Sequence, residues 1–427
     1  MSDQRLTISF SIWGLFDVWE DSIHYNWDTL MAEYVERGFN CIRLETGHGL
    51  LTDLQGNPIE KLEFHPPFGK FSKYLRQMDM ITRDGTINFR KRVLELFRAA
   101  DKYGVKIVPS SWFYIHTYWF LNPDVCDPLL KLTVEEKIDH FAKDLDILLT
   151  MLEENDLIHC VAFAELFNEM NYMPSINPPI INIAMCSKKH ALSIRTAHEA
   201  AIDWLRAKHP TVKFAHDVSN VDFRTDLVPR NIDVLNFHSY YLWKAYHAFE
   251  QGYIMDNLDD IPLPESVTKY LNMEITNDDV LDEMSRSSYI NTVWSWVPRA
   301  RIYSDIAQDK LDEAGKLIEN EMTANYDQYL ARMKRNVDHI IAVRDNIVPH
   351  AQLVMGEGVT YCPHVGFNFE ETSDVYWKFI EEHTNYMRDK GIIGTVPRTN
   401  SGPDDRSWNE CKERYRYINR LFLQEEK

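Results

Sequence analysis

Short apolar segments alternate with longer amphipathic segments along most of this chain. The apolar runs predict strands at 6–12, 39–45, 105–109, 158–163, 212–218, 232–237, 352–356 and 391–396. Segments with an apolar residue every three or four positions predict helices at 27–37, 88–103, 133–154, 187–209, 278–301, 304–346, 373–390 and 408–425. This alternation is typical of parallel strands joined by helical crossovers.

Eight strand–helix repeats in 427 residues predict an α/β fold, a closed (β/α)8 TIM barrel, rather than an open sheet. The extra length is expected in insertions after the second and sixth strands. The first, 47–86, is rich in glycine and proline and predicts a long loop, and a helical insertion is expected at about 250–346. No composition shift marks a linker, so residues 1–427 are predicted to form a single domain.

Polar residues gather at the carboxyl ends of the predicted strands. In a barrel these ends meet on one face, where functional residues lie. Strands four and seven face each other across a barrel, so we expect Glu169 and Glu357 to approach each other. One carboxyl group can protonate a leaving oxygen while the other attacks carbon or activates water, as glycoside hydrolysis requires. The strand-end residues are Arg43, His116, Asn168, Glu169, His238, Ser239, Tyr240 and Glu357.

Four motifs resemble those of clan A glycoside hydrolases, especially the cellulase-like family five. They stand in the family's order between about residues 6 and 400, and the resemblance implies a TIM barrel that cleaves β-glycosidic bonds by a two-step retaining mechanism. The motifs are Gly38-Phe39-Asn40-Cys41-Ile42-Arg43, Glu165-Leu166-Phe167-Asn168-Glu169, His238-Ser239-Tyr240 and Gly356-Glu357.

The resemblance implies a role for each matching residue. Glu169 would be the general acid/base and Glu357 the nucleophile. Asn168 would hydrogen-bond the sugar 2-hydroxyl, a contact that strengthens in the transition state. Arg43 would keep Glu357 ionised, because an opposite charge within ~4–6 Å lowers the pKa of a carboxyl group.

On the sixth strand, the resemblance implies that Tyr240 hydrogen-bonds Glu357 and that His238 lies beside Glu169. Three further residues are predicted to bind sugar. Trp112 follows the third strand near the place of a family histidine, His116 comes later than that histidine, and Trp13 lies in an aromatic loop after the first strand.

The eighth strand departs from the family, which usually has a tryptophan there as a floor for the sugar. Either Trp408 folds back into the site or another ring replaces the missing tryptophan, or else Arg398 and Asn400 contact hydroxyl groups instead. The candidate rings are Trp13, Trp19, Trp112 and Trp296.

Other polar residues have plainer interpretations. Arg43 could form a structural ion pair with Glu45, because an arginine in an apolar strand is costly unless paired. Glu165 is expected to point away from the Asn168–Glu169 pair and to be structural, and Asp217 is a weaker site candidate. Four histidines lack metal-ligand spacing and are read as core or surface residues, so neither a metal nor another cofactor is expected: His48, His159, His216 and His364.

Composition limits the partners and the compartment. The net charge of -19 argues against nucleic acid and anionic membrane surfaces. The 12% aromatic content suits a sugar cleft or simply a large core. Six scattered cysteines without a Cys-x-x-Cys pair, and a start at Met1 without an apolar leader, predict a cytoplasmic protein. No apolar stretch approaches the ~20 residues of a membrane span, and the oligomeric state is unknown from sequence.

The favoured hypothesis is a cytoplasmic retaining β-glycosidase acting on a short oligosaccharide or glycoconjugate. The alternative is a sugar-binding protein on a catalytically inactive cellulase-like barrel, which the altered eighth strand permits. A lyase or aldolase would need a Schiff-base lysine or metal ligands at strand ends, and the sequence shows neither there.

Overall fold

A computed structural model describes residues 5–65, 81, 83–112, 121–170, 175–176, 179–180, 186–219, 223–242, 245, 311–359, 369–399 and 401–424. Within them, eight parallel strands lie in the spatial order β5-β2-β1-β12-β11-β10-β9-β6. A parallel bridge between Ile107 and Val161 joins the two ends of this order, so the predicted α/β barrel is confirmed. The strands are β1 (Leu6–Phe10), β2 (Cys41–Glu45), β5 (Lys106–Ser110), β6 (Ala164–Glu165), β9 (Phe214–Val218), β10 (Val234–Ser239), β11 (Gln352–Gly358) and β12 (Gly394–Thr395).

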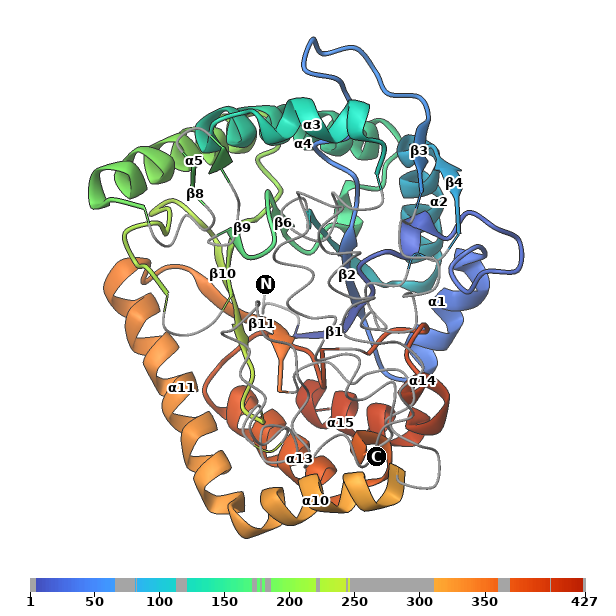
Figure 1. Cartoon of the computed structure of the whole chain (residues 1–427), viewed down its shortest axis with the longest axis vertical. Helices are drawn as coiled ribbons and strands as arrows, with labels where there is room; N and C mark the ends of the chain where they lie inside the picture. Colours follow the sequence, from blue (N-terminus) through green and yellow to red (C-terminus); the bar gives the residue numbers. More distant parts are fainter. Residues whose placement is uncertain are drawn as a thin grey trace, which may run out of the picture.

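Helices surround these strands (Figure 1). The long ones are α1 (Trp27–Glu36), α2 (Phe89–Tyr103), α4 (Val134–Glu154), α5 (Lys188–Lys208), α10 (Leu311–Ala324), α11 (Tyr326–Ile347), α13 (Asp374–Asp389) and α15 (Lys412–Leu423). Shorter ones are η1 (Gly14–Phe16), α3 (Pro123–Leu130), η4 (Ile158–Cys160), α12 (Phe369–Thr372) and α14 (Ser407–Glu410). In the described part of the chain, no helix combines the length and apolarity needed to cross a membrane.

Local sequence signals explain where the helices start and stop. The Thr133 side chain accepts the Glu136 N–H while the Glu136 carboxylate accepts the Thr133 N–H, which is the predicted capping box of α4. Helix α2 ends at Gly104, whose φ of 69° favours glycine because a Cβ is strained there.

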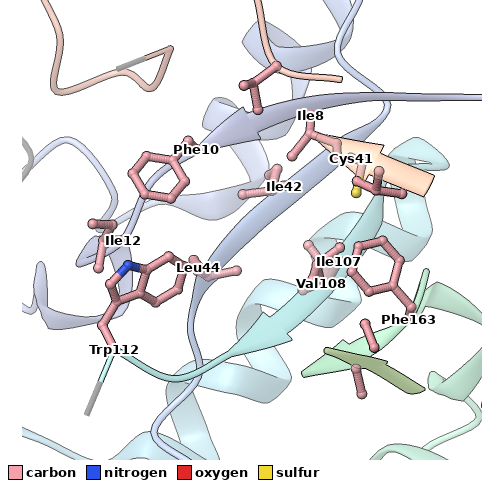
Figure 2. Close-up of a cluster of buried hydrophobic side chains, with 14 of the residues drawn as sticks. Ile8, Phe10, Ile12, Cys41, Ile42, Leu44, Ile107, Val108, Trp112 and Phe163 are labelled. Carbon is pink, nitrogen blue, oxygen red and sulfur yellow. The ribbon is translucent and has the colours of Figure 1, made fainter. Parts of the chain in front are cut away.

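The barrel strands are buried on both faces, as parallel strands covered by helices must be. Apolar side chains of β1, β2 and β5 pack into one continuous cluster, shown in Figure 2. Phe10 and Trp112 meet edge to face with ring centroids 5.4 Å apart. The core therefore reaches up to the strand ends, where it supports the polar residues.

The predicted fourth strand at 158–163 is wrong in position. Its first half is η4, and β6 is the two-residue strand that follows, Ala164–Glu165. Of the apolar run, Cys160 and Phe163 are buried, whereas Ile158, Val161 and Ala162 are only partly buried against the core. A helical turn can place apolar residues on the core as well as a strand does. Asp156, with a φ of 60°, makes the tight turn between α4 and η4.

The insertions also differ in detail. Segment 47–86 is not all loop, because β3 (Leu62–Phe64) pairs antiparallel with β4 (Gly85–Ile87). The small pair β7 (Ser175–Ile176) and β8 (Pro179–Ile180) follows β6. The single helix predicted at 304–346 is two helices, α10 and α11, separated at Asn325. The helix predicted at 278–301 lies outside the described residues, so the extent of the insertion stays a prediction.

Candidate active site

Strand register brings the predicted residues to one end of the barrel. His238 of β10 is paired with Glu357 of β11, after a register shift between Phe237 and His238. One strand further on, Asn236 of β10 is paired with Asp217 of β9. Residues two apart in a strand share a face, so Asn236, His238 and the following Tyr240 point the same way. This face carries the polar centre of the barrel.

Arg43 donates hydrogen bonds to several residues of that centre, and its side chain is completely buried. Its Nε and Nη2 donate to Glu165 Oε2 at 3.0 and 2.8 Å, and Nη2 also donates to Asp217 Oδ2 at 2.6 Å. Its Nη1 donates to Glu357 Oε1 at 3.1 Å. Burial alone would lower the pKa of Arg43, but the charges of Glu165, Asp217 and Glu357 raise it. Arg43 therefore remains a cation.

The alternative pairing of Arg43 with Glu45 is wrong. Glu45 instead accepts the N–H groups of Gly47 and Trp112 at 2.7 Å each and the Ser111 hydroxyl at 3.1 Å. Burial raises the pKa of this carboxyl group to about 7 despite these donors. Glu45 thus fixes the chain beyond β5, on which Trp112 lies.

Glu169 lies just beyond β6 in a strained conformation with a φ of 42°. Its N–H donates to Asp217 Oδ1 at 3.0 Å, which holds that backbone in place. Its carboxylate Oε1 lies 2.8 Å from His238 Nδ1. The Glu169 side chain is 14% exposed, so it is the most accessible carboxylate among the ion pairs of Arg43 and His238.

His238 stands between carboxylates on both sides. Its Nε2 lies 3.0 Å from Asp217 Oδ2, while Nδ1 contacts Glu169 at 2.8 Å and lies 3.7 Å from Glu357 Oε2. A neutral imidazole donates from one nitrogen only, whereas the cation donates from both. Burial would lower the pKa of His238, but Asp217 and Glu357 together with its hydrogen bonds raise it well above the usual value.

Glu357 is a buried residue of the site. The Tyr240 hydroxyl donates to its Oε2 at 2.8 Å, and Arg43 donates to its Oε1. The pKa of Glu357 is raised, because burial together with the charges of Glu169 and Asp217 outweighs the charges of His238 and Arg43, which lower it. Its ionised form therefore depends on these two cations.

Among the described residues, two groups have the geometry to hold a metal ion. In the first, one ligand atom each from Glu169, His238 and Glu357 lie within 4.8 Å of one another. A doubly protonated imidazole has no lone pair to give a metal, so this group fits hydrogen bonding better than coordination. The second is Asp101, His159 and Cys160, which lie away from this centre. Sequence spacing could not show it, because Asp101 comes from α2.

Two polar residues of the site were missed or misplaced by sequence reasoning. Asn236 Nδ2 donates to Glu165 Oε1 at 2.6 Å and to Asp217 Oδ2 at 2.7 Å. The alternation Asn236–His238–Tyr240 could have revealed it. Gly356 leaves room for this amide, since a Cβ there would lie 2.4 Å from Asn236 Nδ2. Glu165 does not point away, because it shares Arg43 with Asn168, whose Oδ1 accepts at 2.6 Å.

Of the three further residues predicted to bind sugar, two are buried and one is outside the described part of the chain. Trp112 is 1% exposed, and the guanidinium carbon of Arg43 lies over its ring, 4.7 Å from the ring centroid. Trp13 is 7% exposed and packs edge to face on Phe16. His116 lies outside the described residues. Sugar binding by these three residues stays a prediction.

Neither Trp408 nor Arg398 takes the place of the missing tryptophan. Trp408 is buried away from the site, stacked on Phe39, with Nε1 donating to Glu33 at 2.7 Å. Arg398 is completely buried and forms ion pairs with Glu370, Glu371 and Asp405 rather than facing a cleft. Asn400 and Trp296 lie outside the described residues.

The fold and this arrangement define a glycoside-hydrolase-like (β/α)8 barrel. A family model described as "Sugar-binding cellulase-like" matches residues 7–360, which is most of the chain. The chain belongs to this cellulase-like family.

One of the solved structures found by comparison agrees with this fold, and two more distant ones are similar to the chain in part. A protein from Parabacteroides distasonis ATCC 8503, provisionally classed as a glycoside hydrolase, is 14% identical with a TM-score of 0.64, covering 99% of this chain and 94% of its own. PbGH5A, a glycoside hydrolase family 5 enzyme from Prevotella bryantii B14, is 10% identical with a TM-score of 0.48, covering 98% and 96%. Cel5A of Thermotoga maritima, solved with mannotriose, is 14% identical with a TM-score of 0.47, covering 96% and 98%. No match to a curated protein was found.

Proposed function

We propose that this protein is a retaining β-glycosidase in which Glu169 is the general acid/base and Glu357 the nucleophile. The observation that carries the proposal is the approach of the two carboxylates, with oxygens within 4.8 Å of each other. Retaining enzymes place these groups about 5–5.5 Å apart, whereas inverting enzymes leave room for water between them at about 6.5–9.5 Å. The short spacing favours a covalent intermediate.

In the first step, protonated Glu169 gives its proton to the glycosidic oxygen while Glu357 attacks the anomeric carbon. The aglycone leaves as an alcohol, and a glycosyl ester forms on Glu357. Arg43 and Tyr240 hold the attacking carboxylate from one oxygen each. With Glu169 neutral, Arg43 and cationic His238 face Glu165, Asp217 and Glu357, so a single negative charge is in excess and the nucleophile can ionise.

In the second step, Glu169 takes a proton from water, which attacks the same carbon and releases Glu357. The sugar therefore leaves with its original configuration. Asn168 is assigned to the sugar 2-hydroxyl, and its position is supported by the hydrogen bond from its N–H to Ser111 O at 2.8 Å. A short β-linked oligosaccharide or glycoconjugate is the proposed substrate class.

The proposal is tested with Glu169→Ala and Glu357→Ala on a panel of aryl β-glycosides. Each should lose about 10³-fold or more in kcat, because acid/base or covalent catalysis is removed. Glu381→Ala, a surface change on α13, is the matched control and should keep full activity. Retention of full activity by both active-site variants would overturn the proposal.

Azide separates the two roles. In Glu169→Ala it should attack the covalent intermediate and yield a β-glycosyl azide. In Glu357→Ala it should replace the missing nucleophile and yield the α-azide by one displacement. Exchange of these two products between the variants would reverse the assignment.

A second candidate function is sugar binding without hydrolysis. It is favoured by the family description and by the eighth strand, where Arg398 is engaged in a buried ion cluster. Calorimetric binding of an oligosaccharide with no product after long incubation, both glutamates being intact, would select it. Turnover of that same sugar would exclude it.

We also propose a reducing, cytoplasmic setting. It is supported by the buried free thiols of Cys41, Cys126, Cys160, Cys186 and Cys411. Thiol titration of protein isolated under alkylating conditions should find them unpaired. Disulfides at these positions would contradict the assignment.

A further inference from the structure

Asp217 is a residue of the polar centre to which the catalytic assignment gives no role. It lies on β9, its side chain is completely buried, and both of its oxygens are used. Oδ1 accepts the backbone N–H of Glu169 at 3.0 Å. Oδ2 accepts from Arg43 Nη2 at 2.6 Å, Asn236 Nδ2 at 2.7 Å and His238 Nε2 at 3.0 Å.

We infer that Asp217 is a positioning residue that acts on Glu169 in two ways, through its backbone and through His238. The inference rests on the proposed function, because it concerns how the acid/base is held. Asp217 has no sugar contact in this account and acts only through other residues.

The first action is on the backbone. Glu169 has a φ of 42°, a sparsely populated conformation that persists only where its surroundings hold it. The hydrogen bond to Asp217 Oδ1 supplies such a restraint at the residue that must transfer the proton. Loss of this bond should let the acid/base move away from the glycosidic oxygen.

The second action is on the imidazole. Asp217 at Nε2 and Glu169 at Nδ1 lie on opposite sides of the His238 ring. Donation to both requires the cation, and the buried negative charge of Asp217 stabilises it. The cation then directs one proton toward Glu169 Oε1, which fixes the orientation of that carboxyl group.

An amide cannot replace the carboxylate without conflict. In Asp217→Asn, one orientation of the new amide places its NH2 group, a donor, opposite the N–H of Glu169, which is also a donor. The other sets NH2 against donors from Arg43, Asn236 and His238. The variant should therefore disturb these contacts while keeping nearly the same volume.

The test uses the full-length protein with 15N-labelled histidine. Wild-type His238, assigned by comparison with His238→Asn, should remain doubly protonated from pH 6 to 8. In Asp217→Asn, His238 should lose a proton within that range. A neutral His238 in the wild type, or an unchanged cation in a folded variant, would overturn the inference, and the wild-type result decides even where the variant fails to fold.

Kinetics give an independent arm. For Asp217→Asn, kcat/KM, which reports the first step, should fall about 10²-fold for glycosides of weakly acidic phenols, because their departure needs a proton. For dinitrophenyl glycosides the fall should be below about tenfold, because that group leaves without protonation. An equal loss for both classes would indicate a merely structural role and contradict the inference.

Asp233→Asn is the matched control. Like Asp217, Asp233 accepts hydrogen bonds from a backbone N–H and from an arginine: its Oδ2 accepts from Phe214 N–H and from Arg206 Nη2, both at 2.9 Å. Asp233 lies just before β10, however, at the opposite end of that strand from the site. It should change neither the His238 signals nor the leaving-group dependence. If the wild type cleaves no glycoside, the proposed hydrolase function fails, whereas the histidine measurement still decides the role of Asp217.

Discussion

Two buried arginines in this barrel hold similar ion clusters with different consequences. Arg43 lies within ion-pair distance of Glu165, Asp217 and Glu357, and Arg398 within that distance of Glu370, Glu371 and Asp405. Both arginines are completely buried, and burial of charge is costly unless it is paired.

The clusters differ in what surrounds the ion pairs. The Arg43 cluster continues through His238 to Glu169, which is strained and partly exposed. In the Arg398 cluster, the paired carboxylates of Glu370, Glu371 and Asp405 are at most 3% exposed. This cluster ties the chain after β12 to α12 and to the segment before α14. A buried arginine among carboxylates therefore does not by itself indicate a catalytic site. What distinguishes the Arg43 cluster is an additional, more accessible carboxylate, that of Glu169.

Replacement of Arg43 should have the largest effect. Arg43→Met should lower kcat about 10²–10³-fold, because Glu357 loses a charge that keeps it ionised and oriented. It should also lower the free energy of unfolding by about 3–5 kcal/mol, the usual result of breaking a buried ion pair. Steady-state kinetics and urea unfolding measure the two effects, with Arg43→Lys as the charge-preserving control. Full activity of Arg43→Met would remove the distinction between the clusters.

Arg398→Met makes the same chemical change in the other cluster. The loss of unfolding free energy should again be about 3–5 kcal/mol, because carboxylates are left buried without their partner. In the folded fraction, however, kcat should stay within about threefold of wild type, because Arg398 forms ion pairs with Glu370, Glu371 and Asp405 rather than with Glu169 or Glu357. A 100-fold loss of kcat in folded Arg398→Met would place Arg398 in the catalytic machinery.

A smaller effect separates His238 from His383, which is buried on α13. Neither ring nitrogen of His383 has a hydrogen-bond partner among the described residues, and burial lowers its pKa to about 3. Its folded pKa lies below the unfolded value of about 6.5, so its contribution is fully present above pH 6.5. That contribution is lost as pH falls from 6.5 toward 3, by up to about 1.4 kcal/mol per pH unit.

His383→Phe should flatten this acid loss by about that slope and be neutral or stabilising at pH 7. Urea unfolding between pH 4 and 7 measures it, and His339→Phe on the exposed face of α11 is the control. An unchanged slope in His383→Phe would show that the histidine is not held neutral.

The barrel fold could be predicted from the sequence because strand and helix periodicities alternate along the chain. Sequence reasoning also predicted that Glu169 and Glu357 approach each other, as they do, because the carboxyl ends of parallel strands meet on one face. It misplaced the fourth strand, since an apolar run predicts burial without distinguishing a strand from a helical turn.

The limits at the site have a similar cause. The partners of Arg43, Glu165 and Asn236 depend on register and side-chain direction across strands distant in sequence. The Arg398 cluster was not foreseen, because its acidic residues come from a short helix and a loop that show no periodicity linking them to β12. Local patterns predict elements, whereas these contacts are set only when the barrel closes.

The central claim is that Glu357 forms a covalent bond to the sugar. A series of activated 2-fluoro-β-glycosides tests it directly, because the fluorine slows hydrolysis of the intermediate and lets it accumulate. Mass spectrometry of the digested protein should find a single fluoroglycosyl group on the peptide that contains Glu357, and none after Glu357→Ala. Turnover of the parent glycosides with no labelled peptide, or a label at another residue, would contradict the account.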